Sequence, residues 1–145
     1  MPLITRLFIK TGLVYFVISL LIGISSQIPS LHFPAITPLF WHMLMLGWIT
    51  QIIIGVSLWM FPGRKKEESF QNQRLGWIAY AGLNSGLFLR VISEPLIYAY
   101  PNTIWGELLV VSAVLHFVGI GSYVLEIWPR VMSRKQRLNR RKKRK

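Results

Sequence analysis

The side chains best placed to do chemistry are two histidines and one arginine that lie inside long apolar segments. His42 is the single ionisable residue of the segment PLFWHMLMLGWITQIIIGVSLWMFP (38–62). Arg90 and His116 lie in two later apolar segments, and Glu94 follows Arg90 at the i+4 spacing of one helical turn. Ionisable groups at membrane depth are costly and mark cofactors, ion paths or helix contacts. A functional hypothesis therefore begins at these residues.

An imidazole and a guanidinium at a similar depth are suited to haem. At 1.5 Å per helical residue, His42 lies roughly 6 Å inside Pro38, and Arg90 lies roughly 7 to 8 Å inside Pro95. The imidazole would be an axial iron ligand, the guanidinium would hold a propionate, and Trp41 would pack on the haem edge. The alternative is structural: Arg90 reaches the interface or pairs with its i+4 glutamate.

The second axial ligand is harder to place. His116 lies roughly 20 Å from Thr103, over 10 Å deeper than His42, whereas two axial nitrogens must lie about 4 Å apart. His116 shares a helix face with small and polar residues, so it is either a packing residue or a site of cofactor or proton chemistry. We expect the second ligand of a His42-bound iron to come from His32, from a second copy's His42, or from another subunit.

Composition narrows the cofactor further. The chain has no cysteine, which excludes disulfides, iron–sulfur clusters and covalent haem attachment. It also has no aspartate, no glycine-rich phosphate loop and no Ser/His/Asp set. A redox cofactor would therefore be held by histidine, methionine or packing alone, as haem b is.

Four apolar runs must position these side chains. They cover residues 7–25, 39–61, 75–93 and 104–128, and each is long enough to cross a bilayer. No cleavage site or polar region follows the first run, so we interpret it as a retained helix. The sequence predicts an all-α, integral membrane four-helix bundle over residues 1–129, followed by a basic tail over 130–145.

The basic residues predict how the chain is oriented. Sixteen of the seventeen lie before or early in the first run, in the second connection, or in the tail, so these places share one side. By the positive-inside rule, both termini are cytoplasmic and the protein is a multi-pass protein of the cell inner membrane. The tail is expected to bind anionic lipids, or an acidic neighbouring protein as the alternative. Nucleic acid is not expected, because no aromatic residues interleave the basic run.

A resemblance sharpens the cofactor hypothesis. The sequence WHMLMLGWITQIIIGVSLWMFP, preceded by LHFPAITP, resembles the second helix of the catalytic subunit of haem-copper oxidases, in particular C-type oxidases and nitric oxide reductases. FIKTGLVYFVISLLIG (8–23) is similar to that family's first helix, and the later two runs match more loosely. The resemblance implies that His42 ligates a low-spin haem b.

The resemblance also implies what is missing. It covers only about the first third of a family member, and the later helices, which carry the other haem ligands and the copper-binding histidines, have no counterpart. No copper is therefore expected, and the chain is not an oxidase or reductase on its own. Two hypotheses follow: a haem b-binding electron-transfer subunit of a respiratory or photosynthetic complex, or a cofactor-free structural or assembly subunit. In either case, we expect other membrane subunits or a homo-oligomer as partners.

Overall fold

The computed structural model describes residues 1–31, 33–61, 74–101 and 104–131, and all regular structure in them is helical. The helices are α1 (Leu3–Ser25), α2 (Ile36–His42), η2 (Met43–Ile49), α3 (Thr50–Met60), α4 (Arg74–Ala99) and α5 (Trp105–Ile127), with short 3₁₀ turns at η1 (Pro29–Leu31) and η3 (Trp128–Arg130). The segment η2 is π-helical and joins α2 and α3 into one span. The predicted tail lies outside the described residues beyond Val131.

Four spans are long and apolar enough to cross a membrane, as the sequence predicts. They are 23 to 26 residues long, and a helix of that length extends about 35 to 39 Å, against a hydrocarbon core of about 30 Å. The all-α prediction is therefore confirmed for the described part of the chain. Each span except the fourth also begins earlier than its apolar run, by one to four residues.

The third span differs most from its predicted bounds. The sequence places the end of that helix before Pro95, yet α4 continues through this proline to Ala99. Proline removes only one backbone donor, and the helix resumes beyond it, where the Tyr100 amide donates to the Leu96 carbonyl at 2.8 Å. Arg90 is therefore further from the end of its helix than a count from Pro95 suggests.

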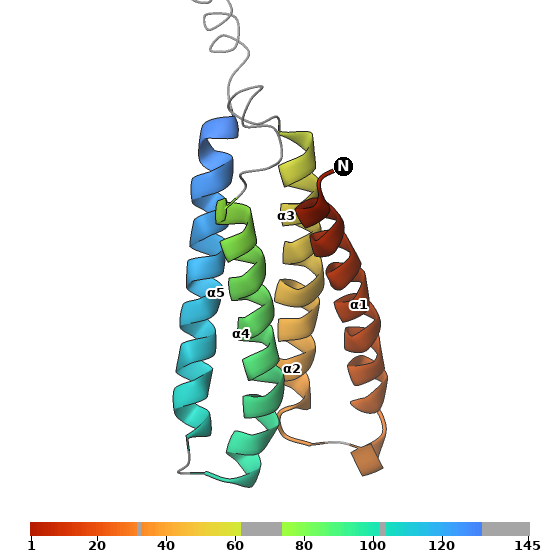
Figure 1. The fold of residues 1–145 in the computed structure, drawn as a ribbon. Coiled ribbons are helices and arrows are strands. Elements are labelled where there is room, and N and C mark those ends of the chain that lie inside the picture. Colours follow the sequence, from red (N-terminus) through yellow and green to blue (C-terminus); the bar gives the residue numbers. More distant parts are fainter. Residues whose placement is uncertain (32, 62–73, 102–103, 132–145) are drawn as a thin grey trace, which may run out of the picture.

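The spans run alternately up and down as two hairpins (Figure 1). The N-terminus and the end of α5 lie at one end, here called the N-terminal end, and the connections α1–α2 and α4–α5 lie at the far end. The helix α1 packs along the α2–α3 span, and α4 packs along α5, whereas contacts between the hairpins are sparser and centre on α4. The position of α4 between the hairpins makes it the helix on which a shared site can form.

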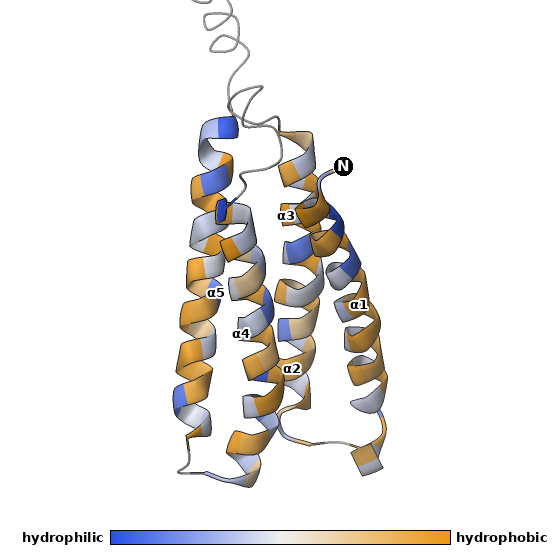
Figure 2. Cartoon of the chain, viewed as in Figure 1, coloured by the Kyte–Doolittle hydropathy of each residue, from blue (hydrophilic) through white to orange (hydrophobic). Residues whose placement is uncertain are grey.

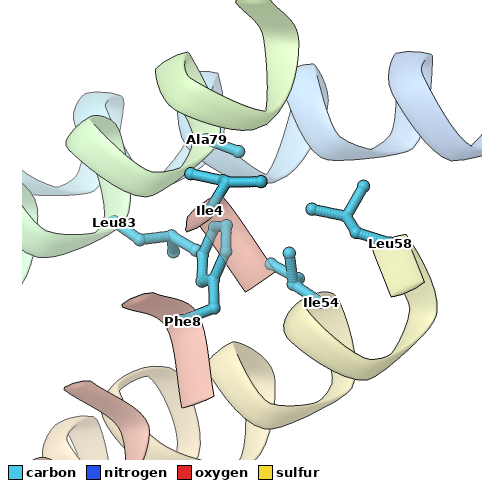
Figure 3. Close-up of a cluster of buried hydrophobic side chains, with 6 residues drawn as sticks. All are labelled: Ile4, Phe8, Ile54, Leu58, Ala79 and Leu83. Carbon is cyan, nitrogen blue, oxygen red and sulfur yellow. The ribbon is translucent and has the colours of Figure 1, made fainter. Parts of the chain in front are cut away.

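A buried apolar cluster joins the hairpins toward the N-terminal end. It draws from α1, α3 and α4, and Figure 3 shows the six side chains converging: Ile4, Phe8, Ile54, Leu58, Ala79 and Leu83. Outward-facing side chains are also apolar, as the predominantly hydrophobic colouring of the helices in Figure 2 shows. Hydrophilic colouring gathers toward the N-terminal end. Apolar outer faces are what lipid or a neighbouring membrane subunit would cover.

The two helices of the second hairpin approach closely along a seam of glycines. A Cβ added at Gly82 would lie 2.9 Å from the Leu115 carbonyl oxygen and 3.0 Å from the Gly119 Cα. A Cβ at Gly86 would lie 2.7 Å from the His116 ring and 3.1 Å from the Ser112 carbonyl oxygen. Close approach through small residues is how membrane helices gain packing contacts.

Polar side chains also link the hairpins within the apolar spans. Thr11 donates to Gln51 Oε1 at 2.7 Å, and Gln51 Nε2 donates to Asn84 Oδ1 at 3.2 Å, so that α1, α3 and α4 are joined. The hydroxyls of Ser57 and Tyr123 lie 2.9 Å apart between α3 and α5. Such hydrogen bonds fix which helix faces meet.

Candidate functional site

The backbone is irregular directly after His42. The π-helical segment η2 begins at the next residue, and at its end the Thr50 amide and hydroxyl both reach back five residues to the Met45 carbonyl, the hydroxyl at 2.8 Å. Gly47, within this segment, allows α1 to approach, because a Cβ there would lie 2.8 Å from Tyr15 Cγ. Single π-helical segments occur frequently at functional sites, where they redirect side chains.

Arg90 is the centre of a polar cluster that joins three helices. From α4, its Nη1 lies 3.2 Å from Nε2 of His42 on α2 and 3.0 Å from Oε1 of Glu94 one turn along its own helix. Its Nε lies 3.4 Å from Oγ of Ser112 on α5. That hydroxyl in turn donates to the Gly86 carbonyl at 2.8 Å. We call these residues, His42, Arg90, Glu94 and Ser112, the Arg90 cluster.

The charges of the cluster lie largely away from solvent. The Glu94 side chain is 6% exposed and that of Arg90 is 17% exposed. His42 Nδ1 lies 2.8 Å from Glu94 Oε1, although the oxygen is off the direction of a ring N–H hydrogen bond. The contact is therefore chiefly electrostatic. Because Arg90 and Glu94 neutralise each other, the cluster avoids the cost of an isolated charge at this depth.

Three polar atoms in this region have no hydrogen-bond partner: His42 Nδ1, Glu94 Oε2 and His116 Nε2. Buried polar atoms are normally paired with protein or ordered water. The His116 ring makes a hydrogen bond to the Leu83 backbone, and its unpaired Nε2 faces Gly86. Thr5 Oγ1 on α1 and Ser93 Oγ on α4 are also unpaired, so three of the five such atoms in the described chain belong to His42, Glu94 and His116.

The two histidines are closer in depth than the helix counts indicate. Arg90 contacts both His42 and Ser112, and His116 follows Ser112 by one turn, so the separation in depth is about 6 Å and not over 10 Å. The helix counts assumed that Pro38, Pro95 and Thr103 lie at one level. Because α4 continues to Ala99, the α4–α5 hairpin reaches further out than the start of α2 (Figure 1). His116 nevertheless presses its ring edge against Gly86, which leaves no room on that side for a porphyrin.

The structure thus brings together two of the five residues singled out as cofactor-binding candidates, His42 and Arg90. Trp41 is 53% exposed and packs edge-to-face on Phe40, with ring centroids 5.3 Å apart. His116 lies one turn away in the α4–α5 seam, and His32 lies outside the described residues. The sequence predicted the pairing of Glu94 with Arg90 but not the contact of Glu94 with His42. That contact joins two helices, so the spacing of residues along one helix could not indicate it.

This geometry suits haem b in part. His42 suits one axial position, because its side chain is 30% exposed and a carboxylate stands at Nδ1, as it often does behind metal-bound histidines. Arg90 suits a propionate by charge. His116 does not suit the opposite axial position. Within the described residues, no three His, Cys, Asp or Glu side chains gather around a point where a metal ion would fit.

Comparisons with protein-family models, with curated proteins and with solved structures find no match to this chain. The resemblance to haem-copper oxidase helices therefore stays a prediction. What the structure defines is a class: an all-helical chain, over its described residues, with four spans suited to a membrane and a neutralised Arg–Glu–His cluster between two hairpins.

Proposed function

We propose that the chain is a haem b-binding subunit of a membrane electron-transfer complex, with His42 as an axial ligand. The observation that carries this proposal is the environment of the His42 ring: a buried carboxylate stands 2.8 Å from Nδ1, while Nε2 faces a cation, the Arg90 guanidinium, at 3.2 Å. A carboxylate behind one nitrogen and a cation before the other is the electrostatic pattern around a metal-bound imidazole.

When bound, haem supplies one-electron transfer, and the chain's own residues supply its setting. His42 would hold the haem iron and Glu94 would orient the ring, while Arg90 would offer its charge to a propionate in place of its contact with His42 Nε2. The apolar faces of the spans keep water from this part of the bundle. A further ligand for the haem would come from His32, a second copy or another subunit.

This function implies a setting for the chain. We place it in the cell inner membrane with both termini cytoplasmic, the basic tail against anionic lipids, and other membrane subunits or further copies of the chain around the bundle. On its own, the chain would carry electrons without reducing oxygen or nitric oxide, because the described polar cluster offers one imidazole for iron and no copper ligands are expected.

The test is an optical difference spectrum, dithionite-reduced minus oxidised, of the protein purified in mild detergent. We expect a b-type α-band in the wild type and its loss in His42→Ala. His116→Asn is the matched control and should keep the band, because that ring lies against Gly86. A wild type without a band, isolated together with its native partners, would refute haem binding, as would a band that survives in His42→Ala.

A specific observation favours a second function, that of a cofactor-free structural subunit. The Arg90 side chain contacts residues of α2, α4 and α5 at the same time, so it joins the two hairpins. In that role the cluster fixes the arrangement of four helices that present their apolar faces to a larger assembly. The absence of a b-type band, combined with loss of the folded bundle when Arg90 is replaced, would support this function over the first.

A further inference from the structure

The His42 ring lies between a group that can only donate a hydrogen bond and a group that, when ionised, can only accept one. Arginine has five N–H donors and no acceptor, so Nε2 must offer its lone pair to Arg90 Nη1 at 3.2 Å. An ionised carboxylate has only acceptors, so at 2.8 Å an unprotonated Nδ1 would be repelled by Glu94 Oε1. Both contacts favour the same proton position.

Glu94 is held in place by the same cluster. Its Oε1 also receives Arg90 Nη1 at 3.0 Å, and the pair lies one helical turn apart on α4. A proton on Nε2 would point at an Arg90 N–H, which is itself a donor. The geometry therefore places a ring proton on Nδ1 and leaves the Nε2 lone pair for Arg90.

We propose that Glu94 is a positioning residue that holds the His42 ring with a proton on Nδ1, so that Nε2 keeps a lone pair, which Arg90 Nη1 contacts in the chain without haem. The tautomer is a property of the chain without haem. Its consequence for haem rests on the proposed function: if His42 held the haem iron, the charge of Glu94 behind the ring would favour the ferric form and lower the midpoint potential.

The first experiment needs no haem. The full chain is labelled with ¹⁵N-histidine, prepared without haem in detergent at alkaline pH, and measured by NMR; the spectrum of His42→Asn assigns the His42 signals by their loss. We expect a proton on Nδ1 and none on Nε2 in the wild type. In Glu94→Gln the Nδ1–H share should fall, because the amide carries no charge and can donate as well as accept. A wild-type ring protonated on Nε2 would overturn the proposal whether or not haem binds.

The second experiment uses the haem-loaded protein in a redox titration followed by the b-type band. Glu94→Gln should raise the midpoint potential, a shift that a purely structural role would not produce. Glu107→Gln is the matched control, since Glu107 is exposed in the first turn of α5 and should leave the potential unchanged. An unchanged potential in Glu94→Gln would overturn the role of Glu94 while leaving haem binding intact. A wild type that binds no haem would refute the proposed function, and the NMR result would still decide the tautomer.

Discussion

The glycine seam between α4 and α5 gives the sharpest test of how the site is held. In Gly82→Ala, the new Cβ would lie 2.9 Å from the Leu115 carbonyl oxygen and 3.0 Å from Gly119 Cα, both of which are backbone atoms. No side-chain rotation relieves these contacts, so the helices must separate by about 0.5 to 1 Å to restore ordinary carbon contact distances. A gap of that size removes about a quarter to a half of the van der Waals attraction energy of each contact along the seam.

The expected loss is about 1 to 3 kcal/mol of unfolding free energy, the usual cost of overpacking. The measurement is reversible denaturation in detergent, followed by circular dichroism. Gly121→Ala on α5 is the matched control, because a Cβ there meets nothing within 4 Å and the stability should stay within about 0.5 kcal/mol of wild type. If Gly82→Ala unfolds at the same denaturant concentration as Gly121→Ala, the close approach of α4 and α5 described here is wrong.

Two further substitutions test the polar links. Arg90→Met should lower the free energy of unfolding by about 3 to 5 kcal/mol, because it leaves the Glu94 carboxylate buried without its cation. The double variant Arg90→Met/Glu94→Gln should recover part of that loss. A double variant no more stable than Arg90→Met would contradict the pairing. Gln51→Leu should lower the free energy of unfolding by only about 1 kcal/mol in the same assay, because Thr11 and Asn84 each keep a backbone hydrogen bond on their own helix. A loss beyond about 3 kcal/mol would contradict this small contribution of the Gln51 hydrogen bonds.

The apolar runs were enough to predict the spans, because hydropathy over about 20 residues reflects transfer into the membrane and needs no knowledge of the neighbours. The sequence also singled out His42 and Arg90, since ionisable groups in apolar runs are rare. It misjudged depth: a count from Pro95 assumed that proline ends a helix, whereas α4 loses one hydrogen bond there and continues to Ala99. It gave no indication of η2, the segment in which Gly47 meets Tyr15 of α1.

Composition and spacing along single helices thus determined four helices, the basic end of the bundle and the few side chains available for chemistry. Only the tertiary structure decided which of them meet. Glu94 and Arg90 are neighbours by helical periodicity, but the contacts of His42 with Glu94 and of Arg90 with Ser112 cross between helices. Those contacts depend on the rotation and approach of the helices, which the glycine seam and interhelical hydrogen bonds set. A pattern along one chain segment carries no information on these quantities, and they decide which group faces each nitrogen of His42.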